Sequence, residues 1–183
     1  IYSVKKKRFV SAEALIRLRH EDFGFISPEE FIPIAERNGL ILGIGEFVFC
    51  EVCRFISEEH LLARGIEYVD VNLSVVQCMQ STLYMQLLDI MKRFELPYHC
   101  ISLEITETAA VLSQETLIEN MDKLREYGIN FSLDDYGTGF ANTAAVVKYP
   151  FHAVKLDKSM VWSAMEDAKA LSALKYSIAM LKE

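Results

Sequence analysis

Short apolar runs alternate along the chain with longer segments in which apolar residues recur every three to four positions. The short runs are typical of buried strands and the longer ones of amphipathic helices, so their alternation predicts an α/β protein with a mainly parallel sheet. Helices are expected over residues 28–38, 45–62, 81–94, 113–127 and 167–181, and strands over residues 1–4, 9–18, 68–73, 100–105, 129–133 and 152–156.

The linkers between these strands predict the topology. Residues 5–8 are too few to form a crossover helix, so we expect the first two strands to be antiparallel and the later ones, which follow helices, to be parallel. At roughly 30 residues per βα unit the chain holds about six units, whereas a closed barrel has eight. The sequence therefore predicts one domain over residues 1–183, an α/β fold of the TIM-like (βα) barrel type with an antiparallel first strand, incomplete at about six of eight strands.

Polar side chains fall on the same face of five successive predicted strands. Side chains alternate between the two faces of a strand, so residues two apart share a face. The charged and amide residues expected to converge are Glu13, Arg17, Asn72, Glu104, Asp134 and Lys155, and Asp70 shares the face of Asn72. Aliphatic residues occupy the opposite face, which in a barrel packs on helices, so we expect the polar set to converge inside.

Several buried carboxylates require positive charge beside them. A cluster of carboxylate and amide oxygens without His or Cys is the ligand set of a hard cation such as Mg²⁺ or Mn²⁺. The alternative is an antiparallel sheet with a solvated polar face, in which Glu13–Arg17 and Asp134–Lys155 are surface pairs of little energetic value. The helices between the strands favour the interior site, because they leave no open face.

The pair Asp134-Asp135 leads directly into a glycine-containing segment, residues 136–139. Two consecutive acids point to opposite sides of a regular strand, but a turn at the strand end can direct both towards metal, and glycine permits the required backbone. An ordinary Asp/Gly turn is the simpler interpretation of the pair alone. Together with Asn72 and Glu104, the pair indicates a metal site.

Composition and charge limit the classes of partner. Hydrophobic residues make up 51% of the chain and charged residues 25%, which is typical of a globular protein. The formal net charge of −7 argues against binding a DNA or RNA polymer, and no apolar run approaches the roughly 18 residues needed for direct membrane insertion. The four cysteines predict reduced thiols, and Cys50 and Cys53 lie on the apolar face of a helix, so zinc is not expected.

Six sequence motifs follow one another along the chain. They are EALIR at residues 13–17, SPEEFIPIAE at 27–36 with GLI at 39–41, NLS at 72–74, EITE at 104–107, DDYGTG at 134–139 and KLD at 155–157. In this order they resemble the EAL family of bacterial cyclic di-GMP phosphodiesterases, and the resemblance extends through essentially the whole chain. One three-letter match would mean little, whereas six in family order are specific.

The resemblance implies a metal-ligand set. The residues that match the ligands of one metal in that family are Glu13, Asn72, Glu104 and Asp134. The match of Asp135 is to the second metal site, so two ions, Mg²⁺ or Mn²⁺, are expected in a complete domain.

The resemblance also implies roles around the reacting phosphate. Lys155 matches the lysine that contacts the attacking water, Arg17 an arginine that binds substrate phosphate, and Glu107 a glutamate that anchors the Asp-Asp loop. With Glu13 and Asp135, Lys155 is thereby expected to be catalytic. The implied reaction is hydrolysis of cyclic di-GMP to linear pGpG, which lowers the level of this second messenger.

The chain departs from the family pattern at a few positions. Leu18, Tyr136 and Ala141 stand where tryptophan, phenylalanine and serine are frequent. We expect the start of the first strand and the last two βα units, which carry a further catalytic glutamate and a glutamine, to lie outside these 183 residues. Activity of this segment alone is therefore not assured by its motifs.

Three functional hypotheses follow. The parent protein is a phosphodiesterase, or a non-catalytic receptor that binds cyclic di-GMP and signals through a partner, or the domain is a dimerisation or scaffold module. An exposed barrel edge favours a homodimer. We expect a cytoplasmic location, in a parent that could be membrane-tethered, with an upstream sensor or diguanylate cyclase-type domain.

Overall fold

The computed structural model describes residues 1–112, 114–138 and 143–182. The elements are, in chain order, β1 (Tyr2–Ser3), β2 (Arg8–Phe9), β3 (Ser11–Ala14), β4 (Leu18–His20), β5 (Gly24–Ile26), α1 (Pro28–Arg37), α2 (Ile41–Glu58), β6 (Tyr68–Asn72), α3 (Val75–Cys78), α4 (Leu83–Arg93), a 3₁₀ turn η1 (Tyr98–Cys100), β7 (Ile101–Thr106), α5 (Glu107–Leu112), α6 (Gln114–Glu126), β8 (Asn130–Tyr136), α7 (Thr143–Lys148), β9 (Ala153–Leu156), α8 (Lys158–Glu166) and α9 (Ala168–Met180).

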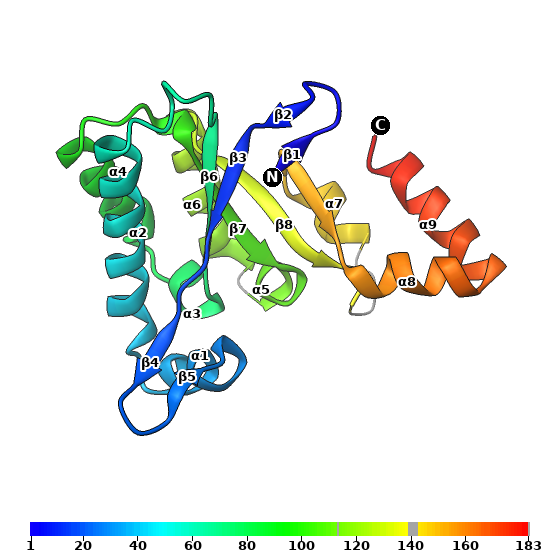
Figure 1. Cartoon of the computed structure of the whole chain (residues 1–183), viewed down its shortest axis with the longest axis horizontal. Helices are drawn as coiled ribbons and strands as arrows, with labels where there is room; N and C mark the ends of the chain where they lie inside the picture. The colour runs from blue at the N-terminus through cyan, green and yellow to red at the C-terminus, as the bar shows by residue number, and fades with distance from the viewer. Residues whose placement is uncertain (113, 139–142, 183) are drawn as a thin grey trace.

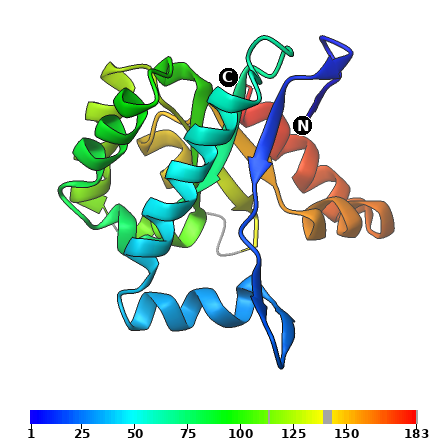
Figure 2. The same ribbon diagram turned by 60° about the vertical axis from the view of Figure 1, so that its left-hand side comes forward.

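A curled sheet of five parallel strands, in the order β3-β6-β7-β8-β9, forms the centre of the molecule (Figure 1). Helices α2, α4 and α6 lie along one side of it, and α1 with the β4–β5 hairpin lies at the end towards which the strand arrows point (Figures 1 and 2). Val71, Leu103 and Leu133 are at most 2% exposed in the hydrophobic core. The predicted α/β fold of an incomplete barrel is confirmed.

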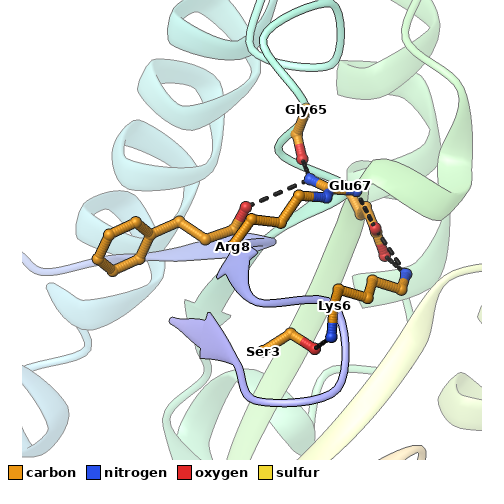
Figure 3. Close-up of polar contacts among 6 residues, drawn as sticks. Ser3, Lys6, Arg8, Gly65 and Glu67 are labelled. Atoms are coloured by element: carbon orange, nitrogen blue, oxygen red, sulfur yellow. Dashed lines mark hydrogen bonds and ion pairs between the residues drawn. The ribbon is translucent and has the colours of Figure 1, made fainter.

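The first two strands form a separate antiparallel ribbon, as the short linker predicts. Tyr2 pairs with Phe9, and Ser3 pairs with Arg8. The ribbon is held to the segment before β6 by Glu67, whose two carboxylate oxygens each lie 2.7 Å from Lys6 Nζ (Figure 3). Arg8 Nη2 lies 2.7 Å from Glu67 Oε1 as well. These contacts place the ribbon at the end of the sheet opposite to α1 (Figure 1).

The second predicted strand is not continuous, which is a correction to the sequence-based boundaries. Only Ser11–Ala14 joins the main sheet, where it is parallel to β6. The chain then leaves the sheet and forms the antiparallel β4–β5 hairpin, with Leu18 opposite Ile26. Residues 15–17 therefore lie beyond the strand, so alternation along the strand does not place Arg17.

Five predicted helices are present as α1, α2, α4, α6 and α9, with ends shifted by a few residues. The start expected at Ser113 lies outside the described residues. The short helix α3 is not predicted by the pattern, because four residues show no periodicity; it is defined by a capping box in which Ser74 and Gln77 satisfy each other's backbone N–H groups. The pattern does not predict α5, α7 or α8 either.

The four cysteines are free, and three of them are buried. Burial, with a smaller contribution from Cys100 and Cys50, raises the pKa of Cys53 to about 12, so this thiol stays protonated at neutral pH. Within the described ranges, no helix is both long enough and apolar enough to cross a membrane.

Candidate active site

The polar face predicted from alternation lies on the inner side of the curled sheet. Glu13 on β3 is opposite Asp70 on β6, and Asn72 is opposite Glu104 on β7. Further along, Thr106 is opposite Asp134 on β8. Because the five strands are parallel, their carboxyl ends meet at one end of the sheet, and these side chains are presented there.

Four of the predicted residues are in direct contact. Lys155 Nζ on β9 lies 3.2 Å from Glu13 Oε2 and forms a second ion pair with Glu104 Oε1. Asn72 Nδ2 donates a hydrogen bond of 3.0 Å to Glu13 Oε1. Strands far apart in the sequence, β3, β6, β7 and β9, thus contribute to one cluster of two carboxylates, one amide and one ammonium.

The two carboxylates of the cluster differ in their electrostatic environment. Burial works to raise the pKa of Glu13, but the hydrogen bond from Asn72 and the charge of Lys155 outweigh it and hold the pKa below its usual value. Glu104, whose side chain is fully buried, has its pKa raised to about 8, chiefly by burial. Burial works to lower the pKa of Lys155, yet Glu104 and Glu13 together raise it. One carboxylate is thus held ionised beside one that resists ionisation.

The Asp-Asp segment interrupts the regular geometry of β8. The β8–β9 register shifts between Leu133 and Tyr136, and Asp135 has a φ of 55°, in the left-handed region. Asp135 remains largely open to solvent, and the partial desolvation of its carboxyl, followed by repulsion from Asp134 and Asp157, raises its pKa. The predicted turn is present but centres on Asp135, one residue before the strand ends at Tyr136.

The Lys155 cluster consists of Lys155, Glu13, Glu104 and Asn72, which are joined by direct contacts. The Asp134-Asp135 pair takes no part in these contacts. Thr138 closes the turn after the pair, since its N–H and its hydroxyl both donate to the Asp135 carbonyl oxygen at 3.2 and 2.9 Å. Gly139 and Ala141, the other positions singled out in this loop, lie outside the described residues.

Arg17 and Glu107 lie at the edge of the site. The Arg17 side chain is exposed, and its Nη1 donates to the Ile16 carbonyl oxygen at 2.8 Å. Glu107 begins α5 directly after β7 and is 6% exposed. Both positions follow a strand carrying a cluster residue, which fits roles beside a ligand rather than within the cluster.

A pocket of about 390 Å³ opens beside the cluster. Its polar wall includes Glu13, Asn72 and Arg17, while α1 and α2 contribute a largely apolar wall with Glu36 as an acidic residue. The alternation of side chains identifies the first wall, but it does not predict that helix α1 and its Glu36 line a site. The β4–β5 hairpin leads directly into α1, which lies beyond the carboxyl end of β3 in Figure 2.

The donor chemistry of the inner face fits a hard divalent cation. It offers carboxylate and amide oxygens, and the two carboxylate oxygens of Asp70 are buried without a hydrogen-bond partner among the described residues. Within the same residues, no group of three or more His, Cys, Asp or Glu is already arranged around one point. In this arrangement the Lys155 ammonium lies between Glu13 and Glu104, and the Asp134-Asp135 pair lies outside their contacts.

Several known proteins are similar to this chain in sequence and fold. A family model described as "EAL domain" matches residues 1–183. The chain is 33% identical over 162 residues to the oxygen sensor protein DosP of Escherichia coli, matching 88% of this chain and 20% of DosP. It is 31% identical to the cyclic di-GMP phosphodiesterase NbdA of Pseudomonas aeruginosa, matching 88% of this chain and 22% of NbdA. The chain therefore spans about a fifth of the length of these curated relatives.

A solved structure described as "PaMucR Phosphodiesterase, c-di-GMP complex" superposes with a TM-score of 0.83 at 28% identity. The superposition covers 92% of this chain and 68% of that one. The five-stranded curled sheet is thus shared with a larger phosphodiesterase structure.

Proposed function

This chain belongs to the EAL domain family, and from that premise we propose that it is the core of a phosphodiesterase that hydrolyses cyclic di-GMP to linear pGpG with a divalent metal. The observation that carries the proposal is the convergence of Glu13, Asn72, Glu104 and Lys155 from four strands beside a pocket. The name of the relative NbdA supports the substrate, and so does the cyclic di-GMP named for the MucR complex.

Glu13, Asn72, Glu104 and Asp134 are the residues that would hold one cation, Mg²⁺ or Mn²⁺, and Asp135 belongs to the site of a second. A bound divalent cation supplies charge that neutralises phosphate oxygens and lowers the pKa of the attacking water. The protein holds the donors in place through strand pairing, which fixes the backbone of Glu13, Asn72 and Glu104 in adjacent strands.

The cationic side chains of the site act on the phosphate and the water. Arg17 offers a planar, forked pair of donors suited to phosphate oxygens at the mouth of the pocket. Lys155 has three donors on one ammonium group, so it can orient the water while it retains a carboxylate partner. Water attacks phosphorus and the ribose 3′ oxygen departs, which opens the ring and leaves a terminal phosphate. Glu107, at the start of α5, anchors the Asp-Asp loop.

The reaction is tested by incubating the full-length parent protein with cyclic di-GMP and Mg²⁺ and resolving the products by chromatography. We expect pGpG from the wild type and at least about a hundredfold slower turnover from Glu13→Gln, which removes a charged donor but keeps the side-chain volume. Glu46→Gln makes the same charge change at an exposed position of α2 and should retain full turnover. A folded, metal-loaded full-length parent without turnover would refute the hydrolytic function.

A second candidate is a receptor that binds cyclic di-GMP without cleaving it. The occupation of Glu13 and Glu104 by Lys155 favours this candidate, because the ammonium takes the oxygens that a cation needs. Calorimetry with cyclic di-GMP in the presence and absence of Mn²⁺ separates the two: a receptor binds equally in both and forms no pGpG. Binding of neither nucleotide nor metal would instead indicate a dimerisation or scaffold module.

The wider setting is also a proposal, since the matched segment is 20% of a relative such as DosP. We place the domain in a cytoplasmic, homodimeric protein with a sensor or diguanylate cyclase-type domain attached. The sensor is supported by the name of DosP. Light scattering on the purified protein tests the dimer.

A further inference from the structure

Asp70 is a buried carboxylate that has no assigned role. It lies on the inner face of β6, opposite Glu13 on β3 and Ser102 on β7, and is 1% exposed. Neither of its carboxylate oxygens has a hydrogen-bond partner in the part of the chain that the structure describes. Burying a carboxylate unpaired is costly, so the position calls for a partner that this arrangement does not supply.

The best candidate for that partner is the Lys155 ammonium. Burial raises the pKa of Asp70, and Ser102 and then the charge of Lys155 act against that rise, so the ammonium is close enough to interact with this carboxylate. Lys155 Nζ lies 3.2 Å from Glu13 Oε2, and Glu13 is the residue opposite Asp70 on the neighbouring strand β3. The same Nζ forms an ion pair with Glu104, which lies on β7, the strand on the other side of Asp70. Asp70 thus neighbours both present partners of the ammonium along the sheet, and the long lysine side chain is flexible enough to change partners.

A divalent cation and the Lys155 ammonium compete for the same oxygens. Glu13 and Glu104 are the two partners of Lys155 and are also two of the donors proposed to hold the cation. Like charges within a few ångströms repel strongly in a buried site. A cation that binds there must displace the ammonium, and a buried ammonium left without a carboxylate partner would oppose the binding.

We propose that Asp70 is the positioning residue that receives the Lys155 ammonium when a divalent cation occupies Glu13 and Glu104. The proposal rests on the metal-dependent function proposed above and adds to it a change of partner for the Lys155 ammonium when the cation binds. In the metal-free protein Lys155 neutralises Glu13 and Glu104. In the loaded protein one N–H of the ammonium is held by Asp70, and the remaining donors face the reacting water.

A double-mutant cycle tests this role, with Mn²⁺ affinity measured by calorimetry on the wild type, Asp70→Asn, Lys155→Met and the double variant. Where Lys155 is present, Asp70→Asn should weaken Mn²⁺ binding by about tenfold or more, because the displaced ammonium loses a charge-assisted hydrogen bond. Where Lys155 is replaced by methionine, the same substitution should weaken binding much less. The difference measures the part of the effect that runs through the lysine.

Equal weakening in the two backgrounds would overturn the proposal, because Asp70 would then act by its own charge or as a direct ligand. An unchanged Mn²⁺ affinity of Asp70→Asn would overturn it as well. A wild type that binds no Mn²⁺ would refute the metal-dependent function itself, and the inference with it. The affinities of wild type and variants thus tell the two failures apart.

Two further measurements distinguish a role in positioning Lys155 from a general effect of the substitution on the fold. Ser11→Ala changes another inward side chain, 2% exposed and with a hydroxyl that lacks a partner among the described residues, and should leave Mn²⁺ affinity unchanged. Without metal, Asp70→Asn should raise the midpoint of thermal unfolding, since it removes an unpaired buried charge. Asp70→Ser serves as the second variant, and the same cycle applies if the asparagine protein does not fold.

Discussion

Replacing Glu104 with glutamine should stabilise the metal-free protein and remove part of its pH dependence. The Glu104 side chain is fully buried, and burial raises its pKa to about 8 against an ordinary value of 4.5, even with Lys155 beside it. Glutamine has nearly the same volume and carries no charge. Lys155 retains Glu13 at 3.2 Å in the variant, so the ammonium is not left without a partner.

The sign and size of the effect follow from linkage. A carboxyl whose pKa is raised on folding contributes no penalty below its unfolded value, and stability is lost as the pH rises from about 4.5 to about 8. At about 1.4 kcal/mol per pH unit the complete loss is at most about 5 kcal/mol. Because the buried glutamine amide also needs hydrogen-bond partners, we expect a net gain of about 2 kcal/mol at pH 8, or about 4–8 °C in the unfolding midpoint.

The assay is urea unfolding at several pH values from about 5 to about 8 in the presence of a chelator, which spans most of the range over which Glu104 titrates. Across this range, the wild type should lose more stability than Glu104→Gln. Glu46→Gln, with the same charge change at an exposed position, should follow the wild type. Parallel curves for wild type and Glu104→Gln, or a variant that is less stable at the alkaline end, would refute the argument that Glu104 resists ionisation in the metal-free interior.

Three other substitutions test separate parts of the structure by chemical unfolding. Gly137→Ala should cost about 1–3 kcal/mol, because Gly137 has a φ of 99° and the new Cβ would overlap the side chain of Met160; a neutral result would contradict this packing. Leu103→Ala removes a fully buried side chain of β7 and should cost about 2–5 kcal/mol, so a loss below about 1 kcal/mol would argue against a close-packed core there. Glu67→Gln breaks only exposed ion pairs and should cost at most about 1 kcal/mol, whereas a larger loss would show that the β1–β2 ribbon is essential to the fold.

Strand periodicity is sufficient to find the inner face of the sheet. In β6 and β7 each residue is followed two positions later by one on the same side, and Asn72 and Glu104 accordingly lie in register. The rule needs only local sequence, because it depends on the pleat of a strand rather than on distant contacts. It therefore predicts which face Glu13, Asn72, Glu104 and Lys155 share, and the expected barrel then predicts that this face points inwards.

The same rule fails where a strand ends earlier than its apolar pattern. Residues 9–18 have a continuous strand-like pattern, yet β3 has only one neighbour in the described sheet, β6, and stops at Ala14. The remaining residues pair locally as the β4–β5 hairpin, which depends on the turn at Gly24, with a φ of 68°. Strand ends are set by which partners are available, and a single strand's sequence does not contain that information.

The pairing of Lys155 with two carboxylates could not be predicted from sequence. The alternation of side chains along a strand gives the face on which a residue lies, but not the residues of other strands that it contacts. Lys155 and Glu13 are 142 residues apart, and they meet only because the sheet curls. Asp70 is a second example. Alternation predicts that its side chain points inwards, but it does not predict that its carboxylate lacks a hydrogen-bond partner among the described residues.

The net negative charge of the inner face favours the binding of a divalent cation there. Around the Lys155 ammonium, Glu13, Asp70 and Glu104 carry a formal charge of −3 when ionised, and Lys155 offsets only +1 of it, so negative charge remains even before Asp134 is counted. A divalent cation would offset this charge, whereas without it protonation of Glu104 lowers the imbalance. The pKa of Glu104 is raised chiefly by burial, and the neighbouring charges of Asp70 and Glu13 add to that rise, so a cation bound in this interior would favour ionisation of Glu104.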